Sequence, residues 1–177
     1  MTEVPVPDHV DLYDQDFLAW TREQAARLRQ AAASRVNAPI DWEHVAEEIE
    51  DLGKRERAEL RSRLRTIIEH LLKLQHSPNQ DPREGWTTTV RRCRIAAKDL
   101  MKDSPSLKPK LPDLLAEAQE GMGELVREEL QGRDRLSEAE AARIGAEPLS
   151  EEQVLGDWLP PTPLPPSPPS RRHPAKR

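Results

Sequence analysis

The sequence predicts an all-α protein, a helical bundle of about five helices with a long second helix. Aromatic residues make up only 3% of the 177 residues and glycine occurs 7 times, whereas sheets favour β-branched and aromatic side chains. Leu, Ile, Val and Ala recur at the i, i+3/i+4 spacing of an amphipathic helix. The length fits a single domain, which we expect at residues 13–161.

The first helix is predicted to begin at Asp14. Its carboxylate can accept hydrogen bonds from the free N–H groups of a helix start, and Tyr13 and Leu18 are placed to form a hydrophobic staple. Residues 1–12 are expected to be flexible. The positions that come next at helical spacing are Phe17, Trp20, Gln24, Leu28 and Ala32.

The second helix is predicted to begin after Asp41, with Ile40 and Val45 as its staple. Gly53 interrupts its apolar pattern and predicts a kink or a frayed turn, because glycine costs about 1 kcal/mol relative to alanine inside a helix. The predicted core stripe comprises Trp42, Val45, Ile49, Leu52, Leu60, Leu64, Ile67, Leu71 and Leu74.

Prolines and serines mark the later elements. A loop between Pro78 and Pro82 precedes a third helix, which ends near Asp103 and is indicated by Trp86, Val90, Ile95, Ala97, Leu100 and Met101. Ser104 with Pro105 predicts a cap and a first helical residue, and Pro109 and Pro112 divide the next segment into a short turn and a fourth helix to about Leu130.

The last helix of the predicted domain is short. Ser150 is its expected cap, and Val154, Leu155 and Trp158 could pack back on the bundle. Residues 162–177 are rich in proline and have almost no apolar side chain to bury, so this basic tail is expected to be disordered.

Charge and composition exclude several classes of function. The net charge of −5 gives no basic field for nucleic acid, so a nucleic-acid partner is not expected. Cys93 is the single cysteine and cannot form an intrachain disulfide, which fits a reducing compartment. No apolar run approaches the ~20 residues of a membrane span, and the first residues lack a signal-peptide pattern. We therefore expect a cytoplasmic protein that does not enter the membrane.

Several runs together resemble a known bacterial family. They are YDQDFLAW, HVAEEIEDLGKRERAELRSRL, HLLKLQHSP, the segment around Trp86, DSPSLKPKL and LSEEQVLGDWLPP. In this combination the chain resembles the DUF29 family, a domain of unknown function, from about Tyr13 to Pro161. The resemblance implies a small helical bacterial protein and no particular activity.

One polar stripe of the second helix is the candidate functional site. At about 100° per residue, the stripe lies beside the apolar stripe, where clefts form and pKa values shift. It contains His44, Glu47, Glu48, Asp51, Glu59, Arg63, His70 and Lys73. The alternative interpretation is an ion-pair ladder, because Glu59 with Arg63 is a favourable i, i+4 pair and Arg55 with Glu59 extends it.

A divalent metal is the second interpretation of this stripe. Glu47, Glu48 and Asp51, with His44, offer carboxylate and imidazole ligands that could hold Mg²⁺ or Mn²⁺. A di-iron bundle needs Glu-x-x-His on two helices, which the chain lacks. A magnesium pyrophosphatase needs a second acidic pair, but residues 86–102 are basic. No cofactor is therefore expected, and Mg²⁺ or Mn²⁺ is the alternative.

The third helix carries a basic run, Arg91, Arg92, Arg94, Lys98 and Lys102. We interpret this run as a surface that packs against the acidic start of the second helix and neutralises its charge. Contact with nucleic acid is the more specific alternative. Cys93, between two of these arginines, is expected to be a half-buried structural thiol.

The sequence supports two functional hypotheses. The first is a non-enzymatic helical module that binds another protein, or its own copy, through the second and third helices, because no nucleophile–base pair, phosphate loop or complete ligand set is present. The second is a metal-dependent hydrolase or nuclease that uses the acidic end of the second helix. The sequence leaves open whether the protein is an enzyme.

Overall fold

A computed structural model describes residues 10–34 and 39–163, and in them it is all-α without a strand, as predicted. The flexible segment and the disordered tail were expected at 1–12 and 162–177, of which residues 1–9 and 164–177 lie outside the described residues. The elements are α1 (Val10–Gln15), α2 (Phe17–Ala33), α3 (Trp42–His76), α4 (Arg83–Asp103), the 3₁₀ helix η1 (Pro105–Lys110), α5 (Leu111–Gln119), α6 (Met122–Asp134), α7 (Glu138–Ala141) and α8 (Glu151–Leu155).

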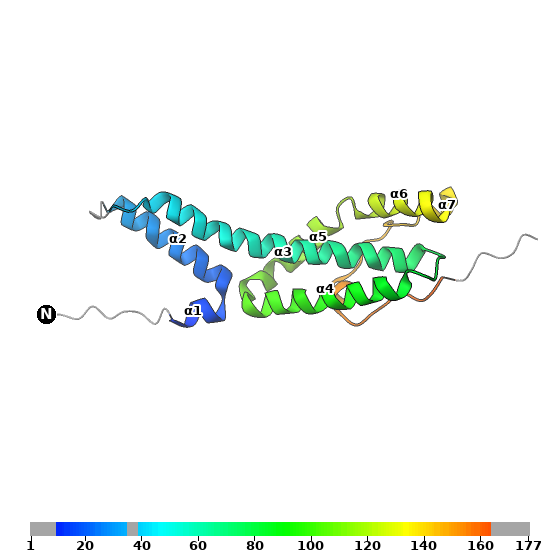
Figure 1. The fold of residues 1–177 in the computed structure, drawn as a ribbon, viewed down its shortest axis with the longest axis horizontal. Coiled ribbons are helices and arrows are strands. Elements are labelled where there is room, and N and C mark those ends of the chain that lie inside the picture. The colour runs from blue at the N-terminus through cyan, green and yellow to red at the C-terminus, as the bar shows by residue number, and fades with distance from the viewer. Residues whose placement is uncertain (1–9, 35–38, 164–177) are drawn as a thin grey trace, which may run out of the picture.

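Helix α3 runs along the length of the molecule and belongs to two different environments (Figure 1). Its second half lies in a bundle with α4, α5 and α6, and contacts α8. Among the described elements, its first half packs mainly against α2, and these two antiparallel helices extend from the bundle as an arm. We define the arm as α2 and residues 42–56 of α3. None of the described helices combines the length and apolar character that crossing a bilayer requires.

The core of the bundle follows the predicted stripe of α3. Leu60, Leu64, Ile67 and Leu71 are fully buried, and Leu74 is 2% exposed. They pack with side chains from the other helices, which include Val90, Ala97, Leu107, Leu114, Val126, Leu130, Ile144 and Val154. The predicted third helix is α4; of the apolar residues that indicated it, Ile95 is 62% exposed and lies outside the core.

In the arm the predicted core is only partly correct. Ala46 and Gly53 are the buried residues in this half of α3, whereas Val45 is 40% exposed and Ile49 and Leu52 are half-buried. The reason is that α2 is the main described helix on this half of α3 and covers only the narrow strip that carries small residues. The sequence pattern marked the larger positions as apolar but did not show which described helices would cover them.

At the starts of α2 and α3, the predicted caps and hydrophobic staples are only partly present. Asp41 caps α3 as predicted, accepting a hydrogen bond from the His44 N–H (3.3 Å), but Ile40 is 46% exposed and forms no staple with Val45. The predicted start at Asp14 is wrong: α1 continues to Gln15, and Asp16 caps α2 through the Ala19 N–H (2.9 Å).

A long-range contact explains why Asp16, and not Asp14, caps α2. Asp16 also accepts hydrogen bonds from the Ser106 N–H (2.7 Å) and the Ser106 hydroxyl (2.9 Å), which ties the start of α2 to η1. The prediction that the Ser104 side chain caps η1 is wrong. The buried Ser104 hydroxyl instead accepts a hydrogen bond from the Leu18 N–H (3.2 Å).

The later elements are shorter than predicted. The expected fourth helix is divided into α5 and α6 at Gly121, whose φ of +72° belongs to the left-handed region that glycine adopts without strain. Ser150 caps α8 with Gln153 in a capping box, as predicted, and Val154 and Leu155 are buried. Trp158 packs partly buried against the core.

Gly53 does not break α3, which is one helix of 35 residues. It marks the place where α2 approaches α3 most closely. A Cβ atom at this position would lie 2.8 Å from Leu18 Cδ1 and closer still to Thr21 Oγ1. The glycine therefore serves the contact between two helices and not a kink.

Replacing Gly53 by alanine is expected to destabilise the protein by about 1–3 kcal/mol, because the overpacking of α2 exceeds the gain of about 1 kcal/mol in helix propensity. Chemical denaturation of the full chain measures the change. Gly132→Ala in α6 is the matched control: a Cβ there meets nothing within 4 Å, so this variant should be stabilised. Equal effects of the two substitutions would contradict the close approach of α2.

Candidate functional site

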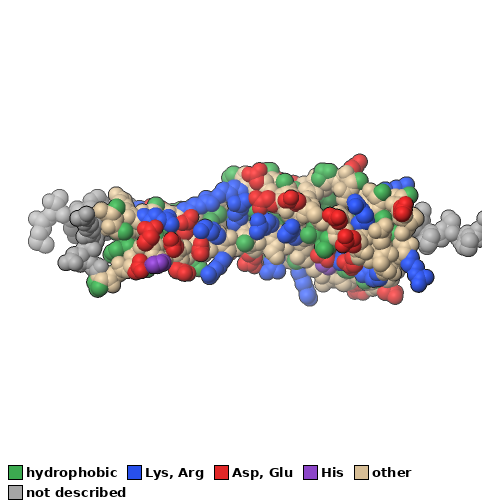
Figure 2. All heavy atoms as spheres, turned by 90° about the horizontal axis from the view of Figure 1, so that it is seen from above, with side chains coloured by type: hydrophobic (Ala, Val, Ile, Leu, Met, Phe, Trp, Pro, Cys, Tyr) green, Lys and Arg blue, Asp and Glu red, His purple; other side chains and the backbone are tan. Residues whose placement is uncertain are grey.

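The predicted polar stripe is spread along α3 and does not converge on one site. His44, Glu47 and Glu48 are exposed on the arm, where Figure 2 shows acidic side chains gathered. His70 and Lys73 lie in the bundle, more than twenty residues further along a helix that rises about 1.5 Å per residue. The structure therefore separates the two histidines of the stripe.

Most charges of the stripe form local ion pairs. His44 Nδ1 lies 2.6 Å from Asp41 Oδ2, and this hydrogen bond raises the pKa of His44. Asp51 binds Lys54 (2.8 Å), and the predicted pair of Glu59 with Arg63 is present (2.9 Å).

The acidic side chains of the stripe do not assemble into a ligand set. Throughout residues 10–34 and 39–163, no group of three or more His, Cys, Asp or Glu side chains is placed to hold a metal ion. Asp51 is occupied by Lys54, and Glu47 and Glu48 point to different sides of the helix, about 100° apart. The three proposed carboxylate ligands of a divalent ion are thus not brought together.

Lys73 is the member of the stripe that the structure buries, with 8% of its side chain exposed. Its Nζ lies 2.7 Å from Glu69 on the same helix and 2.6 Å from Glu129 on α6. Burial lowers the pKa of Lys73, but the hydrogen bonds to Glu129 and Glu69 outweigh it, and the net pKa is raised. Lys73 is therefore a charged link between α3 and α6. His70 beside it contacts the Thr66 carbonyl oxygen (2.8 Å).

The interpretation of the basic run as a partner for the acidic start of α3 is wrong. Glu50 is bound by Arg29 of α2 (2.6 Å), and α4 packs on the other half of α3. Arg91, Arg92, Lys98 and Lys102 are exposed, whereas Arg94 and Cys93 are buried.

Arg94 belongs to the basic run in sequence, but it has a structural function of its own. Its guanidinium donates to the carbonyl oxygens of Val154 (2.8 Å), Gln153 (2.7 Å) and Trp158 (2.8 Å). Burial lowers the pKa of Arg94. The side chain holds α8 and the segment after it against α4. Its position between the buried Val90 and Ala97, on the helical core face, was the available sequence signal.

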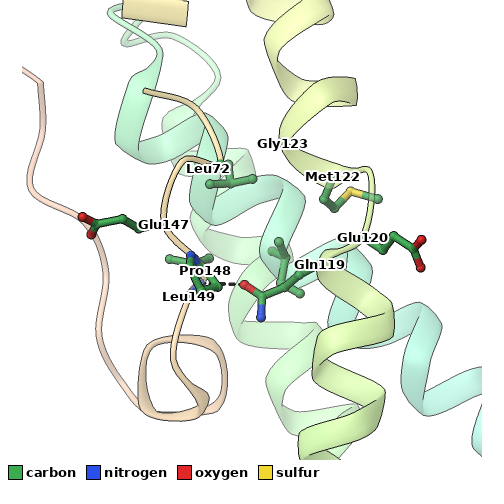
Figure 3. Close-up of a pocket in the computed structure, with 10 residues that line it drawn as sticks. Leu72, Gln119, Glu120, Met122, Gly123, Glu147, Pro148 and Leu149 are labelled. Atoms are coloured by element: carbon green, nitrogen blue, oxygen red, sulfur yellow. Dashed lines mark hydrogen bonds between the residues drawn. The ribbon is translucent and has the colours of Figure 1, made fainter. Parts of the chain in front are cut away.

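A groove lies where residues 145–149 cross between α3 and the start of α6 (Figure 3). Two adjoining cavities of about 280 and 310 Å³ share Leu72, Gly145, Glu147, Pro148 and Leu149 as lining. Gly145 has a φ of +69°, and a Cβ there would lie 2.6 Å from the Cα of Gly123. The groove thus depends on contact between two glycine backbones, which the sequence pattern did not reveal.

The groove has an apolar base and few ionisable groups. Ile68, Leu72 and Met122 line one cavity, in which Gln119 accepts a hydrogen bond from the Leu149 N–H (2.6 Å). His76 and Arg143 line the other cavity. Burial and the charge of Arg143 lower the pKa of His76. No serine, threonine, cysteine or lysine lines either cavity, so the groove offers no side-chain nucleophile of these types.

The arm carries a second candidate surface, on one side of the α2–α3 pair. Its other side is polar: Arg29 of α2 binds Glu43 (3.3 Å) and Glu50 (2.6 Å) of α3. At about 100° per residue, the larger apolar side chains of both helices lie on the side away from these ion pairs. We call this surface the open face; it consists of Phe17, Trp20, Leu28, Val45, Ile49 and Leu52.

An aromatic cluster adjoins the open face where α1 meets α2. Tyr13 contacts the rings of Phe17 (centroids 5.8 Å apart) and Trp20 (4.9 Å) edge-on, and Phe17 stacks on Trp20 at 5.7 Å. Tyr13 is 52% exposed, and Phe17 and Trp20 are half-buried. All but two of the chain's six aromatic residues, Trp86 and Trp158 of the bundle, lie in α1, α2 and the first residue of α3.

The comparisons with known proteins identify a family and a fold. The family described as domain of unknown function DUF29 matches residues 12–156. A solved crystal structure of an alpha-helical protein of unknown function from Rhodospirillum rubrum is similar, with a TM-score of 0.62 and 25% sequence identity. The similarity covers 82% of this chain and 89% of that chain. No curated protein matches the sequence.

Replacing Lys73 by alanine is expected to cost about 2–3 kcal/mol of unfolding free energy, because it leaves Glu69 without its cation and leaves Glu129 with Arg133 alone (3.2 Å). This loss of unfolding free energy is smaller than that for a fully buried ion pair, because 37% of the Glu129 side chain is exposed. Denaturant unfolding measures it, with Lys102→Ala on the exposed side of α4 as the control, expected within about 0.5 kcal/mol of the unchanged chain. A Lys73 variant as stable as the control would show that the link is not structural.

The lowered pKa of His76 predicts a pH dependence of stability. The unfolded state binds a proton on the His76 side chain at a higher pH than the folded state does. The contribution of His76 to the unfolding free energy therefore falls as the pH decreases below the unfolded pKa of about 6.5. As the pH falls from about 6.5 toward the lower pKa of the folded state, the unfolding free energy of the unchanged chain should therefore decrease more steeply than that of His76→Gln. Parallel denaturation curves at each pH provide the comparison, and identical slopes would refute it.

Proposed function

This chain belongs to the DUF29 family, and we propose that it is a non-enzymatic helical module that binds another protein through the open face of its arm. The observation that supports the proposal is the incomplete burial of large apolar side chains on one side of the arm. Val45 is 40% exposed and the other five residues of the open face are half-buried, while the ion pairs of Arg29 lie on the opposite side. A helix of a soluble protein normally buries its apolar stripe.

The chemistry of the open face suits a protein partner. It joins aromatic side chains near the bundle to aliphatic ones toward the tip of the arm; Val45 is the most exposed of them, and the exposed Tyr13 adjoins the aromatic end. Contiguous apolar surfaces of this kind mark interaction sites, and aromatic residues are enriched in the cores of interfaces. The face is carried by two helices held close together at Gly53, so both helices can contact the same partner.

The alternative, a hydrolase or nuclease that uses Mg²⁺ or Mn²⁺ at Glu47, Glu48 and Asp51, has less support. These carboxylates are not directed at a common point, and Asp51 is bound to Lys54. The groove beside residues 145–149 lies in the bundle, and none of these three acids lines either of its cavities.

Site-specific photo-crosslinking in the native host tests the proposal. A photoreactive amino acid in place of Val45, on the open face, is expected to give a covalent adduct of defined mass. The same amino acid in place of Ala26, exposed on α2 away from both α3 and the open face, should give none. No adduct at residue 45, or equal adducts at both positions, would overturn the proposed function.

A further inference from the structure

We propose that the partner on the open face is a second copy of this chain, with the two arms packed face to face and the two α3 helices antiparallel. This inference rests on the proposed function, because it uses the same surface. It adds the identity of the partner and the symmetry of the complex. A surface that binds its own copy about a two-fold axis must be complementary to itself, and three features of the arm meet this requirement.

The first feature is the separation of charge along α3. Acidic residues predominate at its start, at Glu43, Glu47, Glu48, Glu50 and Asp51, and basic residues predominate after them, at Lys54, Arg55, Arg57 and Arg61, with Glu56 and Glu59 among them. Glu43 and Glu50 are already paired with Arg29, and Arg57 and Arg61 with Glu117. A parallel copy would place like charges side by side. An antiparallel copy places the acidic segment of each helix beside the basic segment of the other, which favours this orientation.

The second feature is a specific pair at the edge of the open face. Glu48 and Arg55 are both exposed and lie along the outer edge of α3, next to Leu52. Neither forms an ion pair in the part of the chain that the structure describes. They lie two helical turns apart on one side of α3. A two-fold axis midway between them, level with Asp51 and Leu52, brings each Glu48 to Arg55 of the second copy.

The third feature is found on α2, independently of these charges. The close approach of Thr21 to Gly53 fixes the register of α2 on α3. In that register the proposed axis is level with Arg22 and Glu23, which is also midway between Phe17 and Leu28. The same axis therefore places Phe17 of each copy opposite Leu28 of the other, so that one symmetry element pairs both the charged edge and the apolar side chains.

This agreement favours a second copy over an unrelated protein, because an unrelated partner requires no two-fold relation within the arm. Four helices, two from each arm, would then enclose the six residues of the open face. That arrangement gives Val45, Ile49 and Leu52 the covering layer that α2 does not provide.

Sedimentation equilibrium of the full chain over a wide concentration range tests the inference. The unchanged chain is expected to be a reversible dimer. Glu48→Arg and Arg55→Glu should each raise the dissociation constant about tenfold or more, because each reversal creates two like-charge contacts across the axis. The double variant restores both pairs and should dissociate within about threefold of the unchanged chain.

Glu47→Arg is the matched control, since it makes the same change of net charge at an exposed position that points away from the open face. It should leave the dimer unchanged, and circular dichroism should show all variants equally helical. A chain that is monomeric at every concentration, equal effects of Glu48→Arg and Glu47→Arg, or no recovery in the double variant would each overturn the inference. A monomer that still forms an adduct with a different protein at residue 45 overturns it while leaving the proposed function in place.

Discussion

The packing of α3 is the constraint on which the rest of the structure depends. One helix of 35 residues has two halves that must be stabilised in different ways. In the bundle, α4, α5 and α6 enclose Leu60, Leu64, Ile67 and Leu71. In the arm, one helix has to cover the other, and the contact can be close only where side chains are small. Gly53 and Ala46 provide that strip, so the larger apolar residues of this half are left on one side of it, on the open face.

Buried polar side chains link the elements that the apolar core does not hold directly. Arg94 ties α8 and the segment after it to α4, and Lys73 ties α6 to α3. Ser77 at the end of α3 donates to Asp134 at the end of α6. Each of these groups is expensive to bury without a partner, so each link favours a single arrangement of the short helices around α3.

Sequence reasoning predicted the features that depend on local pattern and missed those that depend on long-range contact. The all-α class, the cap at Asp41 and the core stripe of the bundle follow from helical periodicity and cap chemistry, and these predictions are confirmed. Asp16 replaces Asp14 as a cap because Ser106, distant in sequence, binds it. The polar stripe assumed that one face of a helix has one environment, whereas its residues lie in two, exposed on the arm and buried at Lys73.

The arm is held in place without a partner, which bears on how it can bind one. At its base, the Leu18 N–H donates to Ser104 and Asp16 accepts from Ser106, so α2 is fixed to the bundle through polar contacts that do not involve the open face. Along its length, Arg29 holds α2 to α3 from the opposite side. The apolar side chains of the open face are therefore presented on helices that are already ordered. Because association then requires little further ordering of backbone, most of the free energy from covering these side chains is available for binding.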